Sequence, residues 1–95
     1  MAAYIIAQIE VTDPTKYDAY RKLVPAALTK YHGRFVVRGG EIVALEGGWQ
    51  PPRVVVLEFP NLELAREFYH SQEYGQAKQA REGAARAQIL AVQGV

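Results

Sequence analysis

The stretch RFVVRGGEIVALEGG, from Arg34 to Gly48, decides how we expect this chain to fold. It is rich in β-branched and aliphatic residues, which favour strands. The glycine pair Gly39-Gly40 interrupts the pattern, and the pair Gly47-Gly48 closes it. Glycine inside a strand pattern indicates a bulge or a bend with positive φ. We therefore predict a long strand that is broken at the first glycine pair, which lets it reach a second subunit.

The N-terminal segment before this stretch predicts a strand over Ala3–Val11. Its residues alternate strictly in polarity, and alternate residues of a strand point to opposite faces of a sheet. One face is apolar and the other is mixed; the apolar face holds Ile5, Ala7, Ile9 and Val11, and the mixed face holds Tyr4, Ile6, Gln8 and Glu10.

A helix is predicted next, with Asp13 as the N-cap and Pro14 at the first helical position. Large apolar residues then recur at spacings of three and four as far as about His32, at Tyr17, Tyr20, Val24, Leu28 and Tyr31. Proline lacks a backbone N–H, so Pro25 is expected to kink the helix or to divide it. Gly33 is the expected left-handed C-cap.

The second half of the chain predicts two further strands and a pair of helices. The strand Arg53–Phe59 contains a continuous apolar run, which is typical of a central strand covered on both sides. Pro60-Asn61 ends it and begins a helix, and Ser71 is the N-cap of the next one. Alternation resumes over Arg86–Gln93, which predicts the last strand.

This order of elements, two βαβ units in 95 residues, predicts one domain over residues 1–95. The fold class is α+β, with a ferredoxin-like antiparallel sheet and helices on one face. The opposite face then presents Ile6, Val54 and Val56 to water, and each such side chain forgoes roughly 1.5–3 kcal/mol of burial. We therefore predict a homodimer in which two sheets pack face to face.

Composition excludes several functional classes. The net charge is +1, with 11 basic and 10 acidic residues, which is far from the basic stripe of a nucleic-acid binder. The chain has no cysteine, so disulfides, thiolate catalysis and cysteine-based metal sites are excluded. The apolar run Ala2–Ile9 is too short for a membrane span and lacks the positive leader of a signal peptide. A cytoplasmic protein without membrane contact is expected.

Several short segments together form a recognisable pattern: Tyr4-Ile5-Ile6, Val11-Thr12-Asp13-Pro14, Arg38-Gly39-Gly40, Leu45-Glu46-Gly47, Glu58-Phe59-Pro60 and Tyr69-His70-Ser71-Gln72-Glu73-Tyr74, followed by Arg81. This set of segments resembles the domain of unknown function 1330 (DUF 1330) family. The resemblance covers nearly the whole chain. It implies a small bacterial protein with the dimeric α+β barrel fold. The wider superfamily contains cofactor-free monooxygenases, isomerases and haem-processing enzymes, whereas this family has no assigned reaction.

Arg38, Glu46 and Glu58 are the candidate catalytic residues. By alternation from Phe35 and Val37, Arg38 points away from the helix-packed face, toward the space between the two sheets. There it is either a clamp for a carboxylate or enolate ligand, or the structural ion-pair partner of Glu58 or Glu46. A glutamate in a partly apolar chamber can act as a general base, but pairing with an arginine would hold it ionised and inert.

Tyr69, Tyr74 and Arg81 join Arg38 as candidate ligand-binding residues. The tyrosines lie on inner helix faces, either as core residues or as the lining of a small pocket between helices and sheet. Arg81 lies on an otherwise apolar helix face and needs an acidic or carbonyl partner. Trp49, in the Gly-Pro loop, is expected at the dimer contact or over the mouth of the barrel.

We predict neither a metal nor a cofactor. His32 and His70 are the only histidines, and neither has a second ligand at metal-binding spacing. His70 as a haem ligand, as in some relatives of this fold, has no support in the sequence.

Two hypotheses about function remain open. In the first, the protein binds a small acidic or aromatic metabolite, or is a cofactor-independent enzyme, with Arg38 as the anchor. In the second, it is a non-catalytic structural or interaction homodimer. An open cavity with an unpaired Arg38 supports the first hypothesis, and a filled interior with Arg38 paired to a glutamate supports the second.

Overall fold

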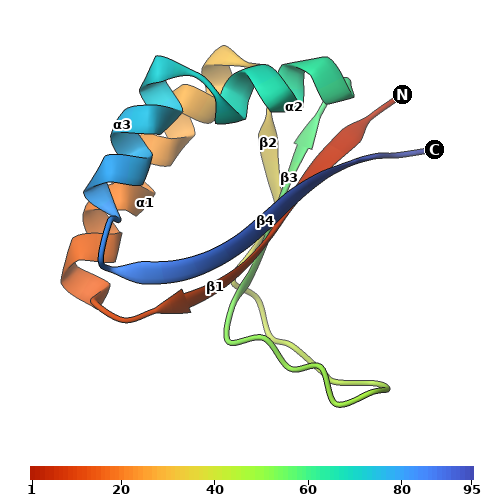
Figure 1. Cartoon of the computed structure of the whole chain (residues 1–95). Coiled ribbons are helices and arrows are strands. Elements are labelled where there is room, and N and C mark those ends of the chain that lie inside the picture. The colour runs from red at the N-terminus through yellow and green to blue at the C-terminus, as the bar shows by residue number, and fades with distance from the viewer.

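The computed structural model describes all residues 1–95 and contains a four-stranded sheet with three helices on one face (Figure 1). The strands are β1 (Ala3–Val11), β2 (Arg34–Arg38), β3 (Val54–Phe59) and β4 (Ala85–Gln93), and the helices are α1 (Pro14–Lys30), α2 (Leu62–Tyr69) and α3 (Gln72–Ala80). All neighbouring strands are antiparallel, in the order β2-β3-β1-β4. This confirms the ferredoxin-like α+β fold and the interior position of β3. None of the helices combines the length and apolar character that crossing a membrane requires.

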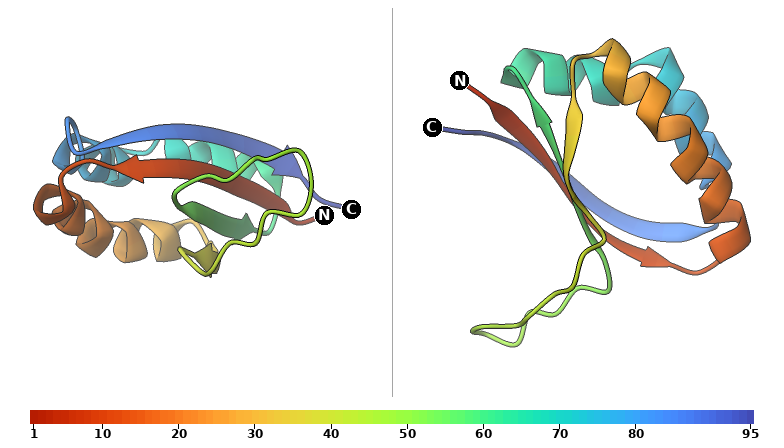
Figure 2. Two further views of the ribbon diagram at one scale, coloured as in Figure 1. Left: turned by 90° about the horizontal axis from the view of Figure 1, so that it is seen from below. Right: turned by 180° about the vertical axis from the view of Figure 1, so that it is seen from behind.

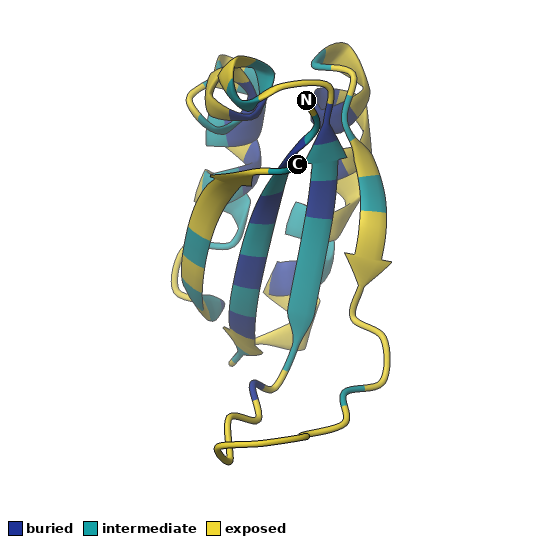
Figure 3. Cartoon of the chain, turned by 90° about the vertical axis from the view of Figure 1, so that its right-hand side faces the viewer, coloured by how far each residue is buried: buried dark blue, intermediate teal, exposed yellow.

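The two faces of the sheet differ as the alternation predicts. Ile5, Ala7 and Ile9 of β1 are buried beneath the helices, and the residues between them are only half-buried. Figure 3 shows this alternation as bands along the inner strands. The register pairs Ile6 with both Val56 and Leu90 on the side without helices. We call this side the outer face. No part of the same chain covers it, so the prediction that β3 is covered on both sides is wrong for a single copy of the chain.

Helix α1 begins as predicted and continues past its proline. The Asp13 side chain accepts a hydrogen bond from the backbone N–H of Lys16 at 3.2 Å, and Pro14 is the first helical residue. Pro25 lies inside a single helix, so it does not divide the helix in two. Val24 and Leu28, on either side of it, are buried, and their packing offsets the hydrogen bond that proline cannot make.

The end of α1 differs from the prediction at one residue. The left-handed position is His32, with φ 62°, and Gly33 is not left-handed. Glycine is required at position 33 because there is no room for a side chain. A Cβ on this glycine would lie 2.4 Å from Cδ1 of Leu28 and 2.6 Å from Cε1 of Phe59, closer than packed side chains approach. Glycine here lets the chain leave α1 and enter the sheet directly over the core.

The stretch Arg34–Gly48 is a strand only over its first five residues. After Arg38 the chain leaves the sheet and forms an extended loop that projects from one end of the molecule and returns at β3 (Figures 1 and 2). Gly39, Gly47 and Gly48 have φ between 71° and 82°, values that turn the chain out of strand conformation. The predicted long strand across the glycine pair is therefore wrong.

Strand β2 also contains an irregularity that the sequence pattern did not predict. Phe35 pairs with Leu57, but Val37 pairs with Val56, so one residue of β2 has no counterpart in β3. Such a bulge reverses the alternation of side chains beyond it. Arg38 pairs with Val55, whose side chain points toward the helices. Arg38 therefore lies on the same face as Phe35.

Helices α2 and α3 close the core from the other side. Asn61 and Ser71 are their N-caps, as predicted, and accept hydrogen bonds from the backbone N–H groups of Leu64 and Tyr74 at 2.8 and 3.1 Å. Phe68 is fully buried between the rings of Phe59 and Tyr74, with centroid distances of 5.2 and 4.7 Å. This aromatic cluster holds the helices against the sheet.

We predict that Gly33→Ala destabilises the fold by about 1–3 kcal/mol, because the added methyl group overpacks the contact with Leu28 and Phe59. Gly75→Ala is the matched control. Gly75 lies within α3 with open space around the Cβ position, so alanine should stabilise the protein by about 0.5–1 kcal/mol. Urea unfolding of the three proteins measures both effects. Equal stability of the native chain and Gly33→Ala would contradict the packing described.

Candidate functional site

A cavity lies between the helix-facing side of the sheet and helices α1, α2 and α3. The unfilled space together with its open mouth measures about 520 Å³, but its enclosed part has room for only about one or two water molecules. The cavity is therefore narrow as it stands. Its lining consists of arginines, aromatic residues and aliphatic residues: Ile5, Ala7, Ile9, Tyr17, Tyr20, Arg21, Val24, Phe35, Arg38, Arg53, Val55, Leu57, Phe68, Tyr69, Tyr74 and Ile89.

Arg38 lines this cavity, and this corrects its predicted direction. Alternation placed it on the outer face, but the bulge after Phe35 turns it toward the helices. Its guanidinium carbon lies 4.1 Å from the centroid of the Phe35 ring, which holds the side chain over the cavity mouth by a cation–π contact. No carboxylate lies within ion-pair distance of Arg38, so the predicted pairing with Glu58 or Glu46 does not occur.

Arg53 is a second cation of the cavity. It immediately precedes β3 and shares the inward direction of Val55 and Leu57. Its Nε atom is buried without any hydrogen-bond partner, and its guanidinium carbon lies 5.9 Å from the centroid of the Tyr17 ring. Arg53 was not among the site residues expected from the sequence. The alternation from Val55 and Leu57 back to residue 53 is the signal that identifies it.

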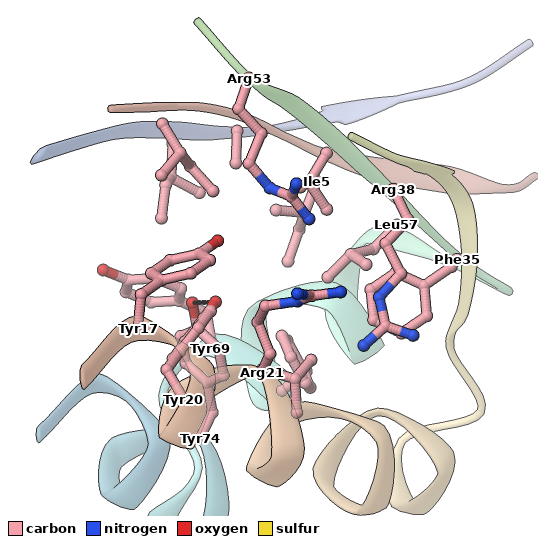
Figure 4. A pocket seen from close by; sticks show the side chains of 16 residues that line it. Ile5, Tyr17, Tyr20, Arg21, Phe35, Arg38, Arg53, Leu57, Tyr69 and Tyr74 are labelled. Atoms are coloured by element: carbon pink, nitrogen blue, oxygen red, sulfur yellow. Dashed lines mark hydrogen bonds between the residues drawn. The ribbon is translucent and has the colours of Figure 1, made fainter. Parts of the chain in front are cut away.

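Arg21 completes the group of basic residues. It lies on α1, one turn after Tyr17, and extends toward the same space as Arg38 and Arg53 (Figure 4). Its Nη1 atom is 3.9 Å from a carboxylate oxygen of Asp18, a distant and half-exposed pair. Arg21 was not among the expected site residues either, although the spacing of four from Tyr17 places it beside the inner face of the helix.

Four tyrosines form the helix side of the cavity. The hydroxyl groups of Tyr20 and Tyr74 are 2.9 Å apart and hydrogen-bonded, and the Tyr69 ring packs 5.4 Å from that of Tyr74. Burial, with the neighbouring Tyr74, raises the pKa of Tyr20 well above its ordinary value of 10.0. The phenol of Tyr20 is therefore neutral at physiological pH and contributes no negative charge to offset the arginines. Tyr69 and Tyr74 line the cavity, and Tyr74 is also a buried core residue against which Tyr69 packs, so both roles considered for them are present.

Glu58 and Glu46 lie away from the cavity. Glu58 is on the outer face, where its carboxylate accepts from Nε of Arg34 at 2.6 Å and from the Tyr4 hydroxyl at 3.2 Å. That bond from Tyr4 to Glu58 raises the pKa of the Tyr4 phenol. Glu46 is exposed in the loop between β2 and β3. The structure therefore does not bring either glutamate together with Arg38.

Arg81 and Trp49 also lie outside the cavity lining. The guanidinium carbon of Arg81 is 5.3 Å from the centroid of the Tyr20 ring, and the side chain lines a separate, open hollow beside α3. The Trp49 ring is mostly exposed, and its Nε1 donates a hydrogen bond to Oε1 of Gln8 at 2.9 Å. This bond connects the extended loop to the outer face of the sheet.

The chain has no group of three or more histidine, cysteine, aspartate or glutamate side chains arranged to hold a metal ion. The cavity lining likewise has no histidine, aspartate or glutamate. Its chemistry consists of three guanidinium groups, phenol hydroxyls and apolar walls. Guanidinium groups bind carboxylates and phosphates with paired hydrogen bonds. The arrangement is therefore suited to holding an organic anion.

The sequence as a whole matches one family model. The domain of unknown function DUF1330 matches residues 2–95. The chain belongs to the DUF1330 family. A comparison with curated proteins finds no significant match to the sequence. Membership confirms the resemblance found in the Arg38-Gly39-Gly40 and Tyr69–Tyr74 segments, and the family description assigns no reaction.

Solved structures similar to this DUF1330 chain share its fold at low identity. RPA0582, a protein of unknown function from Rhodopseudomonas palustris, aligns with a TM-score of 0.77 and 16% identity, covering 99% of this chain and 82% of that one. SnoaB, a cofactor-independent oxygenase from Streptomyces nogalater, aligns with a TM-score of 0.64 and 10% identity, covering 99% of this chain and 93% of that one. A dimeric protein of unknown function with a ferredoxin-like fold, from Bacteroides fragilis, aligns with a TM-score of 0.63 and 11% identity. The alignment covers 98% of this chain and 96% of that one.

Proposed function

We propose that this DUF1330 protein binds a small organic acid with an aromatic or other flat apolar body in the cavity between sheet and helices. The observation that carries this proposal is the convergence of Arg21, Arg38 and Arg53 on one space whose lining has no carboxylate. Like charges held together in a partly apolar cavity repel one another unless an anion joins them. An acidic ligand supplies the missing charge.

The size of the cavity fits a ligand that enters by moving side chains. Small-molecule sites usually enclose roughly 300–1,000 Å³, and the enclosed part of the space here is far smaller than that range. Arg21 and Arg38 are exposed at the mouth and have long, flexible side chains. Their displacement would open the cavity without disturbing the buried aromatic cluster.

Binding is better supported than acid–base catalysis. The catalytic candidates Glu46 and Glu58 lie away from Arg38, and the cavity has no other carboxylate or imidazole. SnoaB shows that a protein of this fold can be a cofactor-independent oxygenase. That chemistry is a second candidate here, favoured by the apolar, tyrosine-lined interior. The structural hypothesis requires buried charged groups that are satisfied internally, and the buried Nε of Arg53 is not.

A thermal-shift screen of organic acids tests the binding proposal. A ligand at 100 times its Kd stabilises the folded protein by about 2.7 kcal/mol, and each kcal/mol raises the Tm of a domain this small by about 4–8 °C. We expect acids that raise the Tm of the native chain to lose most of this effect in Arg38→Ala. Arg34→Ala, on the outer face, is the control and should keep it.

The proposal fails if no acid raises the Tm of the native chain. It also fails if Arg38→Ala responds to every stabilising acid as fully as the native chain does. A response lost equally in Arg34→Ala and Arg38→Ala would indicate that binding occurs elsewhere.

We also propose that two copies associate through the outer face. Four apolar residues form a row across the sheet there, because the register aligns Val37 with Val56, Val56 with Ile6, and Ile6 with Leu90. The molecule is a slab of 34 × 33 × 16 Å. Its accessible surface is 6252 Å², against about 5,500 Å² for a compact monomer of this mass. The dimeric protein from Bacteroides fragilis, with the same fold, supports this assembly.

Leu90→Glu should convert the dimer to a monomer, since Leu90 is 56% exposed in one chain and a charge there would be buried between two sheets. Leu23→Glu is the matched control, because Leu23 is 43% exposed but lies on α1, away from the sheet. Sedimentation equilibrium measures the mass. The native chain and Leu23→Glu should sediment at twice the 10.6 kDa chain mass. A monomeric native chain, or a dimeric Leu90→Glu, would contradict the assembly.

A further inference from the structure

We infer that the ligand of this cavity carries two negative charges and that Arg53 binds the second of them. The inference rests on the binding function proposed above and adds to it the class of ligand. Arg38 was the anchor expected from the sequence. The structure adds a deeper cation, which a ligand with a single charge at the mouth would leave without a counter-ion.

The surroundings of Arg53 are those of a binding group without its partner. Its Nε atom is buried and makes no hydrogen bond, and the Tyr17 ring covers one side of the guanidinium at 5.9 Å. A buried N–H group without an acceptor is rare, because burial removes the water that would otherwise accept from it. A backbone hydrogen bond to β1 fixes the residue in place, since the Arg53 carbonyl accepts from the N–H of Ile9 at 2.9 Å.

Gly39 is the residue that admits this guanidinium to the site. A Cβ at position 39 would lie 2.2 Å from Nη1 and 2.6 Å from Cζ of Arg53, and the backbone there has φ +74°. The Gly39 N–H donates to the carbonyl of Val54 at 3.0 Å, which holds the glycine against the start of β3. The Arg-Gly-Gly segment thus places Arg38 and makes room for Arg53 beside it.

The balance of charge in the cavity sets the charge of the ligand. Arg21 has a partial partner in Asp18 at 3.9 Å, whereas Arg38 and Arg53 have none. Two positive charges without counter-ions are matched by two negative charges on the ligand. A dicarboxylate and a phosphate monoester share this property, and each forms paired hydrogen bonds with guanidinium groups. The rings of Phe35, Tyr17 and Tyr69 suit an aromatic body.

Isothermal titration calorimetry with three simple probes tests the inference: benzoate, benzene-1,3-dicarboxylate and phenyl phosphate. We expect at least one of the two dianions to bind the native chain about tenfold more tightly than benzoate, the ratio that one additional charged hydrogen bond supplies. Whichever dianion binds more tightly shows whether the ligand's acidic groups are carboxylates or a phosphate. In Arg53→Met, which keeps the length of the side chain but not its charge, the ratio should fall to about one. In Arg34→Met it should be unchanged.

The inference is overturned if neither dianion binds more tightly than benzoate, or if the advantage of the dianion persists in Arg53→Met. Its failure is distinguishable from failure of the binding function itself. Benzoate binding that is lost in Arg38→Ala but shows no dianion advantage would leave the proposed function standing and remove the inference. Absence of binding by all three probes would remove both.

Two alanine variants test the part played by Gly39. Gly39→Ala should reduce the affinity for the preferred dianion about as much as Arg53→Met does, because the methyl group displaces the guanidinium. Gly40→Ala is the matched control, since nothing lies within 4 Å of the Cβ position and its φ is not positive. The double variant Gly39→Ala/Arg53→Met should lose no more affinity than Arg53→Met alone, because both changes act through one group. Unchanged dianion affinity in Gly39→Ala would contradict this role.

Discussion

The bulge between Phe35 and Val37 determines where this protein carries its positive charge. Without it, Arg38 would extend from the outer face, the face that carries Arg34 and Glu58. With it, Arg38 turns to the helix side and stacks on Phe35. The chain then bends at Gly39, and the absence of a side chain there admits Arg53 to the same space. A one-residue irregularity on a five-residue edge strand thus adds Arg38 to the space that Arg21 and Arg53 also line.

The two faces of the sheet have different roles. The helix side holds a small core centred on Phe59 and Phe68, with the cavity beside it. On the outer face, Glu58 is paired with Arg34, and the apolar row through Ile6 and Leu90 lies uncovered. On the outer face the charged residues are paired, but the apolar residues are left uncovered. In the cavity the apolar residues are packed, but the arginines lack carboxylate partners. The outer face is therefore the one suited to a second copy, and the cavity is the one suited to an anion.

Much of the fold was predictable because local patterns agree with the tertiary structure. Alternation in Ala3–Val11 identified the buried face, and Asp13, Asn61 and Ser71 are the N-caps expected. The candidate site was less predictable for a physical reason. The bulge in β2 follows from how that strand pairs with β3, and no glycine or proline marks it in the sequence. Strict strand alternation from Phe35 therefore predicts the wrong face for Arg38.

The partners of the charged residues are also set by pairing between distant strands. Glu58 meets Arg34 because the register of β2 and β3 places them opposite each other, 24 residues apart in the chain. Arg53 and Arg21, in contrast, were accessible to sequence reasoning. The alternation of β3 and the helical spacing from Tyr17 point both residues toward the helix–sheet interior.

NMR of the arginine Nε–H groups tests most directly whether Arg38 and Arg53 hold one anion together. Arg34, Arg38 and Arg53 are assigned by substitution with lysine, and benzene-1,3-dicarboxylate and phenyl phosphate are titrated into the native chain. We predict that the Nε–H signals of Arg38 and Arg53 move together and saturate at the same ligand concentration, while that of Arg34 stays in place. A bound dianion that leaves the Arg53 signal unmoved, or that moves Arg34 instead, would contradict the claim.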